Sequence, residues 1–383
     1  MPALTQLFEK YGQSPWLDNL KREWIESGEL HNWVLKGVRG LTSNPSIFEK
    51  AISDSEAYDN QFGSLIKEGH SVEEAYWQLV RKDISDALEI LKPVHESSNG
   101  VDGYVSVEVD PRLARNTIAT IDAARILDHQ INRPNLYIKI PGTSEGLPAI
   151  TQMISEGRSI NVTLLFSIQR YAEVIDAYMS GLEMANGDLS HISSVASFFI
   201  SRTETEVDSR LDQIGSETAL NLKGQTAVAQ GQLAYKLFLS EFNSDRWLAL
   251  KARGAQLQRP LWASTSTKNP KYPDTMYVDE LIGPNTVNTL PDNTLAAFID
   301  HGTLKRSVDS SFDNAERVLQ TVETLGIDLR EVADKLEDEG VKAFETSFEN
   351  LLTTLQQKAE SVSYTHLRAH ETVLDLVCRL LLE

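Results

Sequence analysis

Short stretches in which apolar and polar residues alternate recur along the chain, as in half-buried β-strands. In the segment 136–141, three aliphatic residues alternate with Tyr137, Lys139 and Pro141, so one face is aliphatic and the other carries a lone lysine. The alternation predicts eight strands, at Pro15–Asp18, Gly37–Asn44, Gly103–Val109, Leu136–Pro141, Ser159–Phe166, Ile192–Ile200, Pro260–Ser264 and Asn285–Leu290.

Segments with apolar residues three and four positions apart lie between these strands and predict helices. They are Thr5–Tyr11, Leu20–Ser27, Ser71–Leu91, the segment from Pro111 to Ile131, Leu147–Glu156, Ser167–Ala185, Thr203–Leu239 with a break near Gly215, Ser244–Gly254, Val278–Ile282 and Asn293–Gln357. Strands alternating with helices predict an α/β fold, here a (β/α)8 TIM barrel with additional helices. An open doubly wound sheet is the second architecture, but no Gly-rich phosphate loop follows the first strand.

Composition narrows the class of protein. Acidic residues outnumber basic ones 55 to 36 among 383 residues, and the formal net charge of -19 argues against nucleic-acid and anionic membrane partners. The single cysteine, Cys378, cannot form an internal disulfide, and Met1–Glu9 lacks a signal-peptide pattern. No apolar run is long enough to span a membrane. We therefore expect a cytoplasmic protein. Its length is compatible with one large domain or with two.

The last inward-facing residues of most predicted strands are polar. Barrel interiors are usually filled by branched aliphatic side chains, and barrel active sites form at the carboxyl ends of the strands. One buried polar residue is usually a satisfied structural group, but a whole ring of them predicts an active site. The ring consists of Asp18, Asn44, Glu108, Lys139, Thr163, Ser197 and Ser264.

Lys139 is the candidate nucleophile in this ring. Burial lowers the pKa of a lysine, and a neutral amine can attack a ketone to form an imine. Glu108 and Thr163, one strand away on either side, are placed to hold a water for proton transfer, and Asp18 to take a proton from a substrate hydroxyl. Two other interpretations stay open: Lys139 reaches past the strand end into solvent, or Glu108 forms a salt bridge that keeps it charged.

A phosphate site is predicted beside the ring. Arg202 follows Ser197, and Lys268 follows Ser264 within a serine- and threonine-rich loop. Barrels often bind phosphate in the loops of late strands, and arginine can pair with it bidentately. The alternatives are an ion pair of Arg202 with Glu204 or Glu206, and a solvated Lys268. We predict no metal and no cofactor, because the histidines are scattered or, at His366 and His370, lack the adjacent acid of a zinc-protease motif.

With these features the sequence resembles the transaldolase family, in its longer bacterial form. The matching segments follow the family order over about positions 5 to 358, and they are specific together although none is specific alone. They are Trp16-Leu17-Asp18, Gly40–Ser46, Val105–Arg112, Ile138-Lys139-Ile140-Pro141, Ile160–Ser167, Val195–Arg202, Trp262-Ala263-Ser264-Thr265 and Thr286–Pro291.

The resemblance implies a TIM barrel and a class I aldol mechanism acting on sugar phosphates. Lys139 would form a Schiff base with a ketose phosphate, Asp18 would be the general acid/base of carbon–carbon cleavage, and Glu108 with Thr163 would manage the catalytic water. Asn44 and Ser197 would bind the substrate hydroxyls, and Arg202 and Lys268 the phosphate. Ser264, from the polar ring, is the remaining residue of the expected substrate-binding set. The implied reaction moves a dihydroxyacetone unit from sedoheptulose 7-phosphate to glyceraldehyde 3-phosphate in the pentose phosphate pathway.

Three matters stay open at this point. A related aldolase that releases free dihydroxyacetone and a non-catalytic phosphosugar-binding barrel are competing functions, and both a monomer and a homodimer are compatible with the sequence. The segment 361–383 departs from the family pattern and is either an artefact or an added helix, with an apolar stripe that includes Val373, Leu376 and Leu380. We expect residues 1–360 to form a single barrel domain.

Overall fold

The barrel predicted from the sequence is present and closed. The computed structural model describes residues 2–380, with side chains as far as Glu360. Its strands are β1 (Gln13–Leu17), β2 (Leu41–Thr42), β3 (Val105–Glu108), β4 (Leu136–Pro141), β5 (Ile160–Leu165), β6 (Ser194–Phe199), β7 (Gln258–Ala263) and β8 (Thr286–Leu290). They are all parallel and neighbour one another in chain order, and β1 pairs with β8. This last pairing rules out the open doubly wound sheet.

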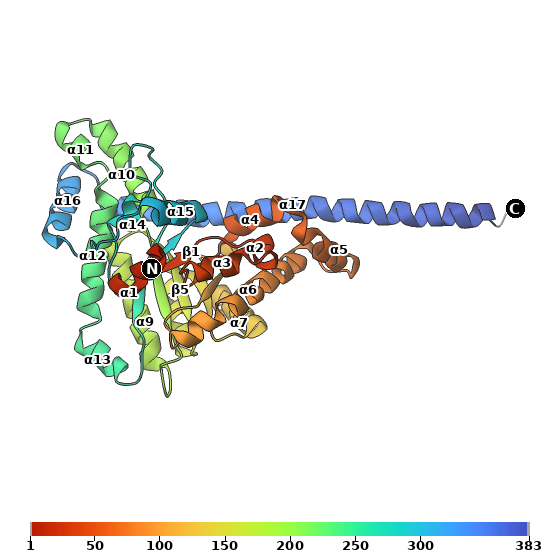
Figure 1. The fold of residues 1–383 in the computed structure, drawn as a ribbon, viewed down its shortest axis with the longest axis horizontal. Coiled ribbons are helices and arrows are strands. Elements are labelled where there is room, and N and C mark those ends of the chain that lie inside the picture. Colours follow the sequence, from red (N-terminus) through yellow and green to blue (C-terminus); the bar gives the residue numbers. More distant parts are fainter. Residues whose placement is uncertain (1, 381–383) are drawn as a thin grey trace.

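Helices surround the barrel. They are α1 (Ala3–Tyr11), α2 (Arg22–Glu26), α3 (Glu29–Leu35), α4 (Pro45–Ser53), α5 (Asp59–Lys67), α6 (Val72–Ser97), α7 (Thr117–Ile131), α8 (Gly146–Ser155), α9 (Ile168–Met184), α10 (Ser201–Ile214), α11 (Glu217–Leu222), α12 (Thr226–Glu241), α13 (Asp245–Lys251), α14 (Met276–Asp279), α15 (Asp292–His301), α16 (Phe312–Thr324) and α17 (Leu329–Leu380), with short 3-10 helices η1 (Glu56–Tyr58) and η2 (Pro111–Leu113). Figure 1 shows α10 to α13 with α16 on one flank of the barrel and α4 to α7 on the other. None of the helices in the described part of the chain is long and apolar enough to cross a membrane.

The second strand is the main departure from the predicted elements. It was expected over Gly37–Asn44 but pairs with its neighbours only at Leu41–Thr42. Gly37 has a φ of +114°, which ends the extended path on one side, and Asn44 caps α4 on the other. The helices α4 and α5 that follow were not predicted. The stretch Thr203–Leu239 breaks near Gly215 as expected, and again before α12.

Inside the barrel the side chains form three levels. Aromatic and aliphatic residues fill the middle level, and Tyr104 stacks on Tyr137 with ring centroids 4.0 Å apart. Below them, at the amino ends of the strands, the buried carboxylate of Asp102 pairs with Arg259 at 2.9 Å and Arg39 at 2.7 Å. The charged groups at this end are already paired, so the polar level at the other end is the candidate place for chemistry.

The last helix, α17, crosses the carboxyl end of the barrel and then extends well beyond it (Figure 1). Its early part packs against α10, η2 and α4. The segment expected to be atypical, 361–383, continues this helix as far as Leu380. Its predicted apolar stripe lies outside the residues whose side chains are described.

Candidate active site

The predicted polar residues come together in one cavity at the carboxyl end of the barrel. The cavity measures about 140 Å³. It is lined by Asp18, Thr42, Asn44, Lys139, Thr163, Ser197, Phe199, Arg202, Ala263, Ser264, Ser266, Lys268, Thr289, Pro291 and Phe344. All site residues expected from the sequence are in this lining except Glu108, which lies directly behind Lys139 and Thr163.

Lys139 is held at the centre by two neighbours. The parallel register places Glu108 of β3 opposite Lys139 of β4, and the Lys139 Nζ lies 2.9 Å from Glu108 Oε2. The same Nζ donates a hydrogen bond of 2.8 Å to the backbone carbonyl of Ser43. Lys139 is only 5% exposed, so the interpretation that it reaches into solvent is wrong. The salt bridge with Glu108, which the sequence left open, is the arrangement present.

Thr163 completes this group from the other side. Its Oγ1 donates a 3.1 Å hydrogen bond to Glu108 Oε1. The register of β5 shifts between Val162 and Leu165, and Leu164 has a φ of +60°, which is uncommon for a residue with a side chain. This bulge turns Leu164 outward into the cluster beneath α17, while Thr163 stays inside the barrel. Lys139, Glu108 and Thr163 therefore form one buried group connected by polar contacts.

Asp18 faces this group from the end of β1. Thr42 Oγ1 donates to Asp18 Oδ1 at 2.7 Å and lies 2.6 Å from the hydroxyl of Thr289. Burial raises the pKa of the Asp18 carboxyl, and the hydrogen bond from Thr42 and the charge of Lys139 only partly offset this. Thr42 and Thr289 were missed from the sequence. Thr289 was detectable, because it is the last inward polar residue of the eighth strand.

Ser197 and Asn44 present polar atoms to the cavity from opposite sides. The Ser197 hydroxyl donates to Asn161 Oδ1 at 2.7 Å, and Asn161 in turn donates to Ser106 Oγ at 3.1 Å. Asn44 Oδ1 accepts from the backbone nitrogen of Ile47 and so caps α4. No described residue bonds the amide nitrogen of Asn44, so Asn44 can offer a ligand donor hydrogens rather than an acceptor.

Ser264 lies in the cavity wall, but not for the predicted reason. The inward residues of β7 are Arg259, Leu261 and Ala263, so the assignment of Ser264 to the inward row was wrong. Ser264 follows the end of the strand with a φ of +56°, and this turn brings it to the cavity. Its Oγ lies 2.8 Å from the Oγ of Ser201 at the start of α10.

Two cations face the open end of the cavity. Arg202 comes from the first turn of α10, stands over the ring of Phe199 at 5.3 Å, and forms no ion pair with any described residue. Lys268 donates to Ser266 Oγ at 2.8 Å. Partial burial and then repulsion from Arg202 lower the pKa of Lys268. Two cations that repel each other beside a helix N-terminus have the charge that a dianion such as phosphate would balance.

Of the two alternatives for these cations, the ion pair of Arg202 is absent among the described residues and the solvated Lys268 is partly correct. Glu206 pairs with Lys335 and Arg210, and Glu204 accepts the backbone nitrogens of Thr226 and Ala227, so Arg202 does not pair with either glutamate. Lys268 is in part a solvated residue, as the alternative held, although it also lines the cavity.

Helix α17 contributes residues that the strand pattern could not reveal. Phe344 lines the cavity. A Cβ atom at Gly340 would lie 2.9 Å from Leu164 Cδ2 and 3.3 Å from Arg202 Nη1. Glycine at this position therefore lets the helix backbone pass directly over Arg202.

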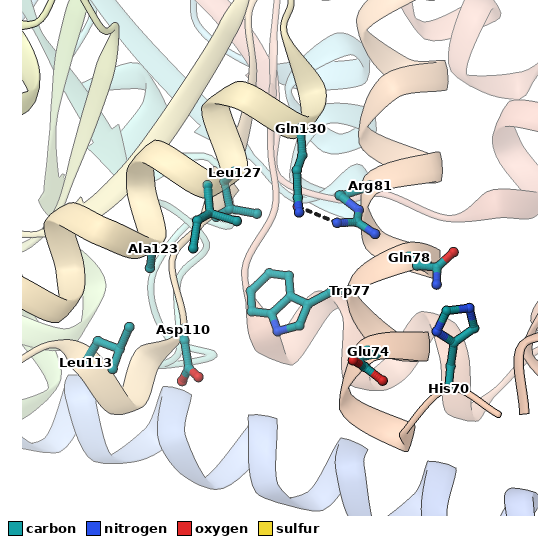
Figure 2. Close-up of a pocket in the computed structure, with 11 residues that line it drawn as sticks. His70, Glu74, Trp77, Gln78, Arg81, Asp110, Leu113, Ala123, Leu127 and Gln130 are labelled. Carbon is teal, nitrogen blue, oxygen red and sulfur yellow. Dashed lines mark hydrogen bonds between the residues drawn. The ribbon is translucent and has the colours of Figure 1, made fainter.

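A larger cavity of about 440 Å³ lies outside the barrel, between α6 and α7. Figure 2 shows Trp77 at its centre, with Arg81 of α6 bonded to Gln130 of α7 at its rim. Leu113, Ala123 and Leu127 form its apolar wall. It has no amine in contact with a carboxylate, so the barrel cavity is the candidate for chemistry.

Comparisons with known proteins agree with this geometry. Residues 15–355 match the family model described as transaldolase/fructose-6-phosphate aldolase. A transaldolase of Thermobifida fusca is 50% identical over 363 residues, which cover 94% of this chain and 99% of the relative. A transaldolase of Frankia alni is 47% identical over 91% of this chain and 95% of its own length, and one of Mycobacterium tuberculosis is 49% identical over 89% and 93%. With a closed barrel, a buried lysine at its carboxyl end and this similarity over nearly its whole length, the chain belongs to the transaldolase/fructose-6-phosphate aldolase family.

Proposed function

We propose that this protein is a transaldolase. It transfers a dihydroxyacetone unit from sedoheptulose 7-phosphate to glyceraldehyde 3-phosphate through a Schiff base on Lys139, giving erythrose 4-phosphate and fructose 6-phosphate. The observation that carries the proposal is the buried amine of Lys139 in contact with Glu108, in a chain about half identical to curated transaldolases.

Lys139 is the nucleophile of the first stage. Glu108 accepts a proton from its nitrogen, and the freed amine forms a bond to the ketone carbon of the substrate. The former carbonyl oxygen receives the proton held by Glu108 and a second proton from the nitrogen, and it leaves as water, which produces the protonated imine. Glu108 and Thr163, joined by their hydrogen bond, hold and move the protons of this stage.

Asp18 acts in the second stage. Its carboxylate takes the proton of the hydroxyl next to the bond that breaks, an aldehyde leaves, and the electron pair of that bond moves into the imine as an enamine. The enamine carbon then attacks the carbonyl of the acceptor aldehyde, whose oxygen receives the proton back from Asp18. The raised pKa of Asp18 suits a group that must both take and return a proton.

The remaining residues bind and orient the substrate. Arg202 and Lys268 hold the phosphate, with Arg202 able to make bidentate contacts. Asn44, Ser197 and Ser264 contact the sugar hydroxyls. The reaction needs no metal and no cofactor in this scheme, because the imine itself serves as the electron sink.

A related aldolase activity is the second candidate, because the matching family description names fructose-6-phosphate aldolase as well. Such an enzyme would release free dihydroxyacetone. Measuring products with and without an aldose phosphate acceptor separates the two: strict dependence on the acceptor supports transfer, and release without acceptor supports the aldolase. A non-catalytic phosphosugar-binding barrel would show ligand-induced thermal stabilisation without turnover.

Trapping of the covalent adduct tests the proposal directly. Sodium borohydride added with fructose 6-phosphate reduces the imine, and a tryptic peptide map is expected to place the adduct on Lys139. Lys139→Ala removes the adduct, whereas Lys342→Ala, at an exposed position on α17, keeps it. An adduct on another lysine, or none in the unmodified protein, contradicts the assignment.

Three wider expectations belong to the same proposal. Residues 1–360 form one catalytic domain, since every proposed site residue lies within it, and the segment 361–383 takes no part in the reaction. The protein acts in the cytoplasm, as expected from its single cysteine. It binds sugar phosphates rather than nucleic acid or membranes, and works as a monomer or a homodimer.

A further inference from the structure

The loop between β7 and α14, residues 264–275, carries Lys268 and is tied to α10 at both of its ends. At the first end, the Ser201 backbone nitrogen donates to the Ser264 carbonyl at 3.0 Å, and the two side-chain hydroxyls lie 2.8 Å apart. At the second end, the hydroxyl of Tyr272 donates to Asp208 Oδ2. Lys268 lies between these two attachments, and Arg202 projects from the same helix.

The second attachment is made to a buried carboxylate. Asp208 is 8% exposed, and its Oδ1 accepts the Gly224 backbone nitrogen at 3.1 Å. The ring of Tyr272 lies against Gly224, where a Cβ atom would stand 3.1 Å from Tyr272 Cζ. Gly224 has a φ of +79°, a conformation that also favours glycine. The ring and hydroxyl of Tyr272 therefore pack into a site formed by helix α10 and the turn before α12.

We propose that Tyr272 is a positioning residue for phosphate recognition, which fixes the loop 264–275 on Asp208 so that Lys268 stands opposite Arg202. Because α10 then holds both cations, the distance between them is fixed before the substrate binds. Arg202 and Lys268 repel each other, so a loop without this attachment would move Lys268 away into solvent. Ordering the lysine again would then cost part of the binding energy of the phosphate. The inference rests on the proposed function, because it takes the ligand of these cations to be the phosphate of a sugar phosphate.

Tyr272→Phe tests the inference because it removes one hydroxyl and keeps the ring on Gly224. Transfer to glyceraldehyde 3-phosphate and to unphosphorylated glyceraldehyde is measured at saturating fructose 6-phosphate. Loss of one hydrogen bond predicts a rise of about fivefold in KM for the phosphorylated acceptor. The KM for glyceraldehyde, and kcat with either acceptor, stay within about twofold. Tyr277→Phe is the matched control, because Tyr277 and Tyr272 both line a second cavity beside Asp208, but the hydroxyl of Tyr277 bonds no described residue.

Combining Tyr272→Phe with Lys268→Ala tests whether Tyr272 acts by positioning Lys268 or by supporting the fold in general. Tyr272→Phe is expected to cause no further rise in KM there, because the group that it positions is gone. Equal rises for both acceptors, an unchanged KM for glyceraldehyde 3-phosphate, or full additivity with Lys268→Ala would each overturn the inference. Borohydride trapping of dihydroxyacetone, which has no phosphate, is run on the same proteins. If the unmodified protein forms no adduct, the proposed function fails; if it does and KM is unchanged, only the role of Tyr272 fails.

Discussion

The side-chain nitrogen of Lys139 and the Oε2 atom of Glu108 lie 2.9 Å apart on adjacent strands, in a setting where both are almost fully buried. Removing either partner of this pair would leave the other as an uncompensated buried charge, so the two groups depend on each other. In the proposed reaction, Glu108 takes the proton that Lys139 loses when it attacks the ketone, and holds it close to the carbon that reacts. The contact thus connects the resting enzyme to the first chemical stage.

Glu108→Gln should separate these roles, because glutamine keeps the shape of the side chain but cannot accept the proton. We expect kcat to fall by roughly 10²- to 10⁴-fold with a smaller change in KM, as for loss of a general acid–base group. Steady-state kinetics check this, with Glu96→Gln on the exposed end of α6 as the control. A kcat within about threefold of the original would remove Glu108 from the proton route.

Asp18→Asn should stop the reaction after imine formation. The variant is expected to form the borohydride-trapped adduct with dihydroxyacetone, while cleavage of fructose 6-phosphate falls by about 10²-fold or more. Failure to trap dihydroxyacetone would show instead that Asp18 is needed to build the imine.

The same substitution should stabilise the fold. Burial raises the pKa of Asp18, so the ionised form is disfavoured in the folded state and its cost is present once the pH exceeds the ordinary value of 3.8. The neutral amide of the variant carries no such cost, and thermal unfolding at neutral pH should show a higher Tm for the variant than for the unmodified protein. At a pH low enough to protonate Asp18 in both states, the difference should shrink.

Glu204 should give a distinct pH dependence of stability. Burial, and then the charge of Asp208, raise the pKa of Glu204 to about 8, against the opposing hydrogen bonds from backbone nitrogens at the start of α12. The folded state therefore binds a proton more tightly than the unfolded state, and the contribution of Glu204 to the free energy of unfolding falls as the pH rises from 4.5 towards 8. The slope of this contribution approaches about 1.4 kcal/mol per pH unit.

Urea unfolding of the unmodified protein and of Glu204→Gln, at several values across that window, measures this contribution. The stability of the variant relative to the unmodified protein should increase with pH. A constant difference between the two would mean that Glu204 has an ordinary pKa in the folded protein.

Gly340→Ala should weaken phosphate binding from the side of α17. The added methyl group would meet Leu164 and the guanidinium of Arg202, so one of them must move. We expect KM for glyceraldehyde 3-phosphate to rise by about three- to tenfold, with kcat less affected, since a shift of Arg202 weakens a charged hydrogen bond. Lys342→Ala, nearby on the exposed face of α17, serves as the control.

Removal of the segment 361–383 should leave the enzyme active. Among the residues whose side chains are described, Phe348 and Leu355 pack α17 onto the body, and both precede the cut. Both kcat and KM of the shortened protein should agree with those of the full chain within about twofold. A marked loss of activity would assign the segment a role in the catalytic domain.

Much of the site was predictable because strand geometry has a period of two. Once 136–141 is a strand, Lys139 must share a face with Tyr137, and the parallel register then brings in Glu108 and Asn161. The closing of the barrel followed from the number of strand–helix units. These inferences need only local patterns and the rule that barrel sites lie at the carboxyl ends of the strands.

Other parts of the site could not be predicted, because they depend on strand ends, bulges and contacts between distant elements, which the local spacing of residues does not show. Ser264 was placed in the inward row because the alternation along β7 was assigned to the wrong face: Leu261 and Ala263 point inward, and the strand ends at Ala263. The bulge at Leu164 has no distinctive residue such as glycine to indicate it. Gly340 and Tyr272 act on elements far away in the chain, so their roles emerge only when those elements are packed together.

The passage of α17 over Arg202 has a consequence for synthesis of the enzyme. Every strand and every reacting side chain has left the ribosome well before Gly340 and Phe344 are made, yet these two complete the wall around the substrate. A nascent chain can therefore close its barrel while the binding site is still unfinished, and the site is complete only after α17 has been made.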